Sequence, residues 1–292
     1  MKKKILSLCV LSTVIIISLI GYSGENFSDL KKENSSQKNI IFNLDYNPGG
    51  IRKNLDDVSE IFLQYSYEED QKIDGSYRYS WFEAKTEALS IINELKNESE
   101  KTVVVLPVFT HTSYSPFGFY DYFNQICTEK CLQIKIERGK LTPLGNAGKN
   151  AIQILHALNY NFISDIDIDL NPKILLNYDK VILLHNEYVT KKEFEAITNH
   201  PKVMYLYPNA LYAEIHYDSI NDTISLIKGH GYPESDIGNG FGWEFDNTHP
   251  YEYDVDCNDW EFYEIKNGQM LNCYPEEKIW KDKLLLKTIK EF

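Results

Sequence analysis

The chain has 292 residues, and 30 Lys and Arg against 43 Asp and Glu give it a formal net charge of −13. This acidic balance argues against nucleic acid as a partner, because phosphate binding needs clustered Lys and Arg. Hydrophobic residues at 43% and charged residues at 25% exclude bulk disorder, and the length is enough to bury a sizeable core.

The N-terminus has the pattern of an export signal. Three lysines at positions 2–4 precede an uncharged apolar run at 5–20, and Gly21 and Ser23 offer small residues for cleavage. The same run could instead stay uncleaved as a membrane anchor through residue 22. Either way the body of the protein is expected outside the cell or on its surface, touching the membrane only through this segment. We expect a signal peptide or anchor at 1–24, a flexible stalk at 25–39 and one α/β domain at 40–292.

The first part of the domain combines strand and helix patterns. Apolar runs at 40–45 and 58–67 flank the turn signal Asn47-Pro48-Gly49-Gly50 and predict two strands. Apolar residues recur at helical spacing over 81–96, which predicts a helix there.

Strand and helix signals then alternate from 102 to 206. The continuous apolar runs TVVVLPV and KVILL are typical of strands covered on both faces. Thr190 with Glu193 forms a capping-box pattern that predicts a helix start. This alternation predicts a doubly wound parallel sheet. The expected strands are 102–108, 131–136, 180–184 and 202–206, the expected helices are 147–158, one from Asn171 and one from Thr190, and 162–168 is expected to be extended.

The C-terminal part, 211–275, has a β-rich pattern that predicts an antiparallel extension of the sheet domain. Strands are expected at 211–217 and 223–228, and Asn267-Gly268 predicts a hairpin between 260–265 and 269–273. A closing amphipathic helix is expected at 276–290.

Four cysteines follow the apolar N-terminus: Cys127, Cys131, Cys257 and Cys273. An even number in an exported protein predicts two disulfides, and pairing Cys127 with Cys131 and Cys257 with Cys273 closes the shortest loops. A four-cysteine zinc site is the alternative, but these spacings do not form two close knuckles.

Candidate chemistry lies after two of the expected parallel strands. His185 and Glu187 follow KVILL, and His111 and Tyr114 follow TVVVLPV. Because parallel strands end at one edge of a sheet, we expect Tyr114, His185 and Glu187 to converge there. A histidine and a carboxylate in such a loop can ligate a metal or transfer a proton. The alternative is structural: His185 caps a loop, Glu187 pairs with a lysine, and the aromatic residues pack.

Alternating aspartates at Asp165, Asp167 and Asp169 resemble the start of a calcium loop. Leu170 stands where that loop needs glycine, and Leu176 stands where it needs glutamate. We therefore interpret the segment as a strand leaving the sheet, followed by residues that cap a helix.

Residues 180–215, KVILLHNEYVTKKEFEAITNHPKVMYLYPNALYAEI, resemble the C-terminal domain of the N,N-dimethylformamidase large subunit, a branch of the class I glutamine amidotransferase-like fold. That resemblance implies an amide-hydrolysing mononuclear iron site, with Glu187 and Tyr114 as ligands and His185 as a neighbouring catalytic group. The segment 131–144, where a second tyrosine ligand is expected, contains no tyrosine. No cysteine nucleophile follows KVILL, so glutaminase chemistry is not expected.

Two functions remain as hypotheses. The first is an exported hydrolase of amide C–N bonds that acts on a small molecule, either with a metal such as iron or by acid–base catalysis. The second is a non-catalytic binding or interaction module at the cell surface that keeps the fold, because a fold alone does not determine function.

Overall fold

The computed structural model describes residues 44, 46, 49–56, 58–76, 78–138 and 148–292. All the described residues belong to one compact unit, residues 39–292. The expected signal or anchor, the stalk and most of the expected strand at 40–45 lie outside the described residues. Within the described part, no helix is both long enough and apolar enough to span a membrane.

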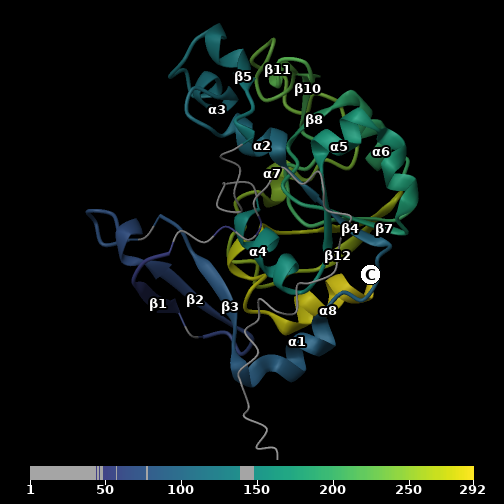
Figure 1. The fold of residues 1–292 in the computed structure, drawn as a ribbon. Helices are drawn as coiled ribbons and strands as arrows, with labels where there is room; N and C mark the ends of the chain where they lie inside the picture. The colour runs from purple at the N-terminus through teal and green to yellow at the C-terminus, as the bar shows by residue number, and fades with distance from the viewer. Residues whose placement is uncertain (1–43, 45, 47–48, 57, 77, 139–147) are drawn as a thin grey trace, which may run out of the picture. The chain divides into compact units, whose positions relative to one another are not determined.

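A six-stranded sheet forms the centre of the fold, in the order β12-β13-β9-β7-β4-β6 (Figure 1). All its neighbouring pairs are parallel except β12 and β13, which form an antiparallel hairpin. The protein is therefore a mixed α/β protein, and the expected antiparallel C-terminal hairpin extends a parallel sheet. The strands are β4 Thr102–Leu106, β6 Asn161–Ser164, β7 Lys180–Leu183, β9 Val203–Tyr205, β12 Phe262–Ile265 and β13 Gly268–Leu271.

Helices pack on both faces of this sheet. Successive side chains of β4 point to opposite faces, so they join different core clusters. Val104 and Leu106 join the core cluster that contains the apolar residues of α1, α4 and α8. Val103 and Val105 join the cluster that contains Ile168 of α5, Leu175 of η6 and Ile197 of α6. The helices are α1 Leu89–Leu95, α4 Lys149–Ala157, α5 Asp165–Leu170, η6 Pro172–Asn177, α6 Lys191–Thr198 and α8 Lys283–Glu291.

Two smaller sheets complete the described part. One has the order β5-β11-β10-β8, with β10 antiparallel to β11 and parallel to β8. The other is the antiparallel sheet β1-β2-β3. The strands are β1 Arg52–Asp56, β2 Phe62–Tyr67, β3 Trp81–Ala84, β5 Gln133–Lys135, β8 Tyr188–Thr190, β10 Ala213–Asp218 and β11 Thr223–Lys228. The remaining short helices are η2 Glu68–Asp70, η3 Thr86–Ala88, α2 Val108–Ser113, α3 Phe119–Phe123, η4 Glu129–Leu132, α7 Thr248–Tyr251 and η7 Pro275–Glu277.

Several expected elements differ in the structure. The strand expected at 131–136 is only β5, which pairs antiparallel with β11 outside the central sheet, and the helix expected at 276–290 forms as η7 and, from Lys283, α8. Residues 81–84 of the expected helix form β3, because Trp81 to Ala84 pair with β2, and α1 begins only at Leu89. The segment expected to be extended at 162–168 becomes helical at Asp165. Ser164 and Asp167 form a reciprocal capping box there, and this local signal outweighs the alternation of apolar and acidic residues.

The C-terminal hairpin is shifted by one residue from its expected turn. Ile265 pairs with Gly268, so Lys266 and Asn267 are the turn residues, and Phe262 faces Leu271. Gly268 approaches β9 so closely that a Cβ there would lie 1.8 Å from the carbonyl oxygen of Val203. The glycine therefore serves strand packing instead of the turn.

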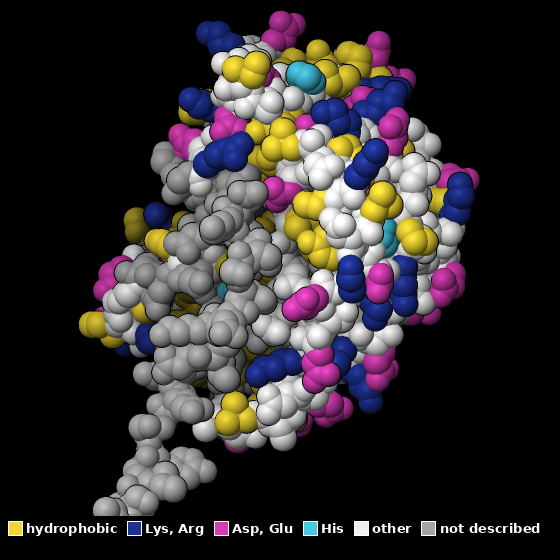
Figure 2. Space-filling view, turned by 45° about the vertical axis from the view of Figure 1, so that its right-hand side comes forward, with side chains coloured by type: hydrophobic (Ala, Val, Ile, Leu, Met, Phe, Trp, Pro, Cys, Tyr) yellow, Lys and Arg dark blue, Asp and Glu magenta, His cyan; other side chains and the backbone are white. Residues whose placement is uncertain are grey.

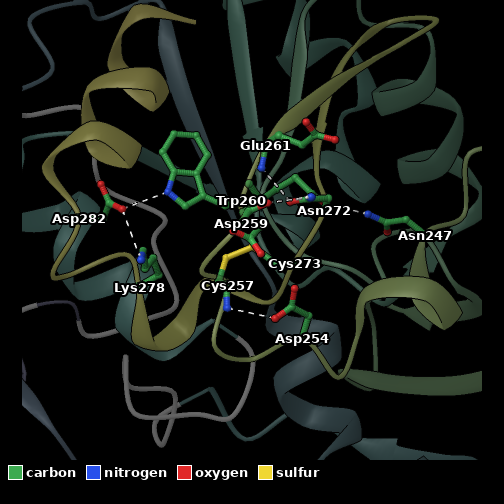
Figure 3. Close-up of a disulfide and its surroundings, with 11 residues drawn as sticks. Asn247, Asp254, Cys257, Asp259, Trp260, Glu261, Asn272, Cys273, Lys278 and Asp282 are labelled. Carbon is green, nitrogen blue, oxygen red and sulfur yellow. Dashed lines mark hydrogen bonds and ion pairs between the residues drawn. A yellow bond between two sulfur atoms is a disulfide. The ribbon is translucent and has the colours of Figure 1, made fainter.

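The two disulfides have the pairing favoured by loop length. Cys127 and Cys131 have Cα atoms 6.0 Å apart, and Cys257 and Cys273 have Cα atoms 5.2 Å apart, both within the usual bridging range. Figure 2 shows acidic and basic side chains interspersed over the described part of one face. Figure 3 shows the second disulfide beside Asp254, whose carboxylate accepts the backbone N–H of Cys257. This bridge links the segment that follows β13 to the loop that precedes β12.

Candidate functional site

The site lies where the chain leaves β4 and β7, which are adjacent parallel strands. After β4 the chain enters the short helix α2, and Tyr114 is the residue that ends this helix. After β7, residues 184–187 connect directly to β8 in the four-stranded sheet. Glu187 is therefore held between the carboxyl edge of the central sheet and the first residue of β8.

Backbone hydrogen bonds fix the position of Glu187. The side-chain oxygen of Thr110 accepts the N–H groups of Glu187 at 2.9 Å and of Tyr188 at 3.1 Å. The carbonyl oxygen of Glu187 accepts N–H groups from Tyr212 and Ala213, each at 2.9 Å. The loop is thus attached to α2 on one side and to the start of β10 on the other.

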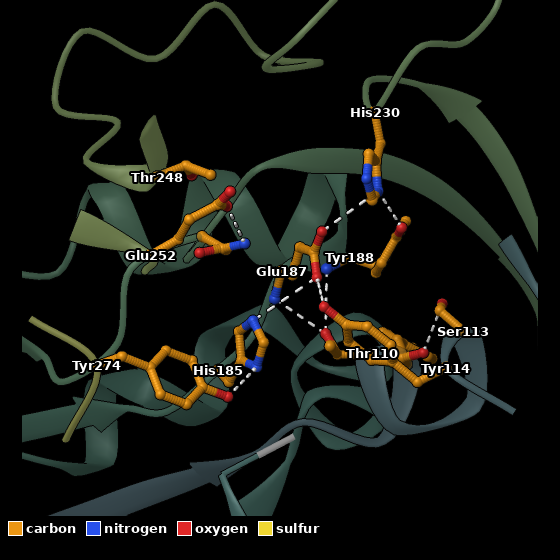
Figure 4. Close-up of polar contacts among 12 residues, drawn as sticks. Thr110, Ser113, Tyr114, His185, Glu187, Tyr188, His230, Thr248, Glu252 and Tyr274 are labelled. Carbon is orange, nitrogen blue, oxygen red and sulfur yellow. Dashed lines mark hydrogen bonds and ion pairs between the residues drawn. The ribbon is translucent and has the colours of Figure 1, made fainter. Parts of the chain in front are cut away.

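The structure brings Tyr114, His185 and Glu187 together (Figure 4). The Tyr114 hydroxyl donates to Oε2 of Glu187 at 2.5 Å. Nε2 of His185 lies 3.6 Å from the same oxygen. The other carboxylate oxygen, Oε1, lies 3.4 Å from Nδ1 of His230. One carboxyl group therefore faces a phenol and two imidazoles.

His230 is the site residue that sequence reasoning missed. It stands between Gly229 and Gly231 after β11, with a positive φ of 52°, and the Tyr188 hydroxyl forms a hydrogen bond with its Nδ1. The ring of Phe123 packs 4.1 Å from the ring of His230, centroid to centroid. A histidine between two glycines was the available signal, but no strand pattern placed that loop near Glu187.

Burial determines the charge state of the group. Glu187 has no exposed surface, and burial raises the pKa of its carboxyl to about 8, although the Tyr114 hydrogen bond lowers it and the charge of Glu252 raises it. Burial lowers the pKa of His185 and of His230 to about 4, so both rings are neutral near pH 7. Burial, and then the charge of Glu187, raises the pKa of Tyr114 well above its usual value.

His111 does not join this group. It lines a separate cavity of about 280 Å³ together with Ser115, Ile134 and Lys135. Burial lowers the pKa of His111 to about 4. Of the two candidate residues that follow β4, only Tyr114 therefore reaches Glu187.

The side chains around Glu187 include groups that can bind a metal ion. Carboxylate, phenol and imidazole groups are all suitable ligands for iron, and Nε2 of His185 and Oε1 of Glu187 have no hydrogen-bond partner. In the described part of the chain, however, no three His, Cys, Asp or Glu side chains are arranged to hold a metal ion. The hydroxyl of Tyr114, which contacts Glu187, is a further oxygen ligand that this group offers.

Comparison of the chain with known proteins gives no information on its function. No protein-family model matches the chain, and no curated protein matches it. The functional argument therefore rests on the chemistry of Glu187 and the groups around it.

Proposed function

We propose that the protein is an exported hydrolase of amide C–N bonds in small molecules, with Glu187 as its central catalytic group. The observation that carries the proposal is the environment of Glu187: a fully buried carboxyl, raised to a pKa of about 8, that contacts Tyr114 and faces two neutral histidines. Perturbed carboxyl groups of this kind are enriched at catalytic sites.

A carboxyl with a pKa near neutrality can both accept and return a proton. In amide hydrolysis the ionised Glu187 takes a proton from water as the water oxygen bonds to the amide carbon. Glu187 then returns that proton to the leaving nitrogen as the C–N bond breaks, which gives a carboxylic acid and an amine. The cycle leaves Glu187 in its starting state and needs no other reactant.

The neighbouring groups have supporting roles in this proposal. A neutral histidine can donate a hydrogen bond to the carbonyl oxygen as negative charge develops on it, and His185 lies next to Glu187 for this task. The Tyr114 hydroxyl stabilises the ionised carboxylate by donating to Oε2. Glu187 has no exposed surface and His185 is 4% exposed, so even a small substrate reaches them only if neighbouring side chains move.

The resemblance of residues 180–215 to dimethylformamidases is the reason for choosing this reaction class. It also motivates a metal-assisted version of the proposal, in which Tyr114 and Glu187 hold an ion such as iron. For the fold, it motivates the proposal that the chain has the doubly wound, class I amidotransferase-like arrangement. An ion would polarise the amide carbonyl and activate water. The basic and apolar N-terminus and the two disulfides support export.

The test is amine release from a panel of small formamides and carboxamides by the purified protein. We expect hydrolysis by the wild type and loss of it in Glu187→Gln, which keeps the shape of the side chain but cannot accept a proton. Glu193→Gln is the matched control, because Glu193 is equally buried on α6 and its carboxyl lies outside this group. Elemental analysis of the same sample separates the metal-assisted version from acid–base catalysis.

One observation favours the non-catalytic alternative. The absence of exposed surface on Glu187 is also what a purely structural polar network requires. Under that alternative, a cell-surface binding module, the wild type releases no amine from any substrate and Glu187→Gln changes only stability.

A further inference from the structure

The two nitrogens of the His185 ring face different chemical groups. Nδ1 lies 3.3 Å from the hydroxyl of Tyr274, whose ring meets the imidazole edge-on. Nε2 lies 3.6 Å from Oε2 of Glu187 and has no hydrogen-bond partner. Figure 4 shows Tyr274 and Glu187 on opposite sides of His185.

A neutral imidazole carries one proton, and its location decides which nitrogen donates and which accepts. His185 is almost fully buried, and burial favours the neutral ring. A tyrosine hydroxyl next to a ring nitrogen can donate to it only if that nitrogen is bare. The proton must then be on the other nitrogen.

We propose that Tyr274 is a positioning residue for His185: its hydroxyl donates to Nδ1 and so keeps the ring proton on Nε2, the nitrogen that faces Glu187. The 3.3 Å contact allows either direction, and the assignment follows because a bare Nε2 would face Oε2 of Glu187, which already accepts from Tyr114. The catalytic consequence of this assignment rests on the proposed function, because an Nε2–H group is the donor that the developing negative charge on a carbonyl oxygen requires.

The ring plane of His185 is fixed from another direction. Tyr207 stacks on the imidazole with an interplanar angle of 13° and a centroid distance of 5.9 Å. The Tyr207 hydroxyl donates to Oε1 of Glu276 at 2.8 Å, and Oε2 of Glu276 accepts the N–H of Asn150 at 3.0 Å. These hydrogen bonds restrain Tyr207. Because the Tyr207 ring stacks on the imidazole, it restrains the plane of the His185 ring.

The backbone around Tyr274 is also restrained. Its N–H donates to the carbonyl oxygen of Asp254 at 2.8 Å. The preceding residue, Cys273, is bonded to Cys257. The disulfide and this hydrogen bond therefore fix the position from which the hydroxyl reaches Nδ1.

The experiment is nuclear magnetic resonance of the full chain labelled with ¹⁵N in its histidines, because the ¹⁵N shifts distinguish the two neutral tautomers. The signal of His185 is identified by its loss in His185→Gln. We expect the wild type to show the proton on Nε2, and Tyr274→Phe to move it to Nδ1 or to give a mixture. Tyr263→Phe is the control, since its hydroxyl contacts the sulfur of Met270, and it should leave the tautomer unchanged.

Either of two results would overturn the inference: a wild-type ring with its proton on Nδ1, or an unchanged tautomer in a folded Tyr274→Phe. If that variant does not fold, the wild-type spectrum alone decides the proton position. A confirmed tautomer in a protein that hydrolyses no amide would refute the proposed function and leave this inference standing.

Discussion

Replacing Glu187 by glutamine should remove one defined contribution to the pH dependence of stability. The folded carboxyl has a pKa of about 8 against a usual value of 4.5, so the folded state binds this proton more tightly than the unfolded state does. A group of this kind stabilises the fold fully below pH 4.5, and its contribution is lost as the pH rises towards 8. Glutamine stays neutral throughout and does not incur this loss.

The magnitude follows from the two pKa values. They differ by about 3.5, and a difference of one corresponds to about 1.4 kcal/mol, so ionisation costs the folded state up to about 5 kcal/mol above pH 8. At pH 7 the carboxyl is mostly protonated in the folded state and ionised in the unfolded state, so the cost is about 3 kcal/mol. Glu187→Gln should therefore match the wild type near pH 4 and exceed its stability at pH 7 by a few kcal/mol.

The assay is urea unfolding followed by tryptophan fluorescence from pH 4 to pH 9, with chelator present to remove metal ions. Subtracting the wild-type free energy of unfolding from that of the variant cancels the titration of other groups. Glu60→Gln, which changes an exposed carboxyl, provides the baseline. Parallel pH profiles for wild type and Glu187→Gln would refute the reasoning, because the environment of Glu187 could not then favour the protonated form.

Three further predictions concern the framework of the site. Thr110→Val should lower the free energy of unfolding by about 2 kcal/mol in urea titrations, because it leaves two buried N–H groups without an acceptor; a neutral effect would contradict this. Gly268→Ala should lower the thermal midpoint by several degrees, since the added Cβ collides with the backbone of β9, and an unchanged midpoint would argue against this strand packing. Replacing both Cys257 and Cys273 by alanine should cost about 3 kcal/mol in the same urea titrations, and equal stability of wild type and variant under non-reducing conditions would disprove the bridge.

The sequence predicted the central strands because their signals are local. TVVVL and KVILL are too short and too apolar for ordinary helices, and they become β4 and β7 with every position buried or nearly so. Adjacent parallel strands deliver their loops to one edge, so the meeting of Tyr114 with Glu187 follows from topology. The capping-box pattern also predicted the helix start at Thr190. Only half of that box forms: the Thr190 side chain accepts the N–H of Glu193, whereas both carboxylate oxygens of Glu193 lack hydrogen-bond partners.

The features that the sequence did not predict depend on contacts between residues that are far apart in the chain. Trp81 to Ala84 fit a helical pattern, but pairing with β2 makes them a strand, and no local pattern contains that partner. His230 reaches Glu187 only because β10 and β11 extend the sheet that begins with β8. The one-residue shift of the C-terminal hairpin arises because Gly268 must pack against Val203, a constraint that a turn pattern cannot contain.

The most direct test of the account is the rate of amine release from small amides as a function of pH, for the wild type and for Glu187→Gln. Because the ionised carboxylate is the proposed base, the wild-type rate should rise with pH and level off above about 8, and Glu187→Gln should release no amine. Equal rates in the two proteins, or no release by the wild type from any amide in the panel, would contradict the central role of Glu187 in amide hydrolysis.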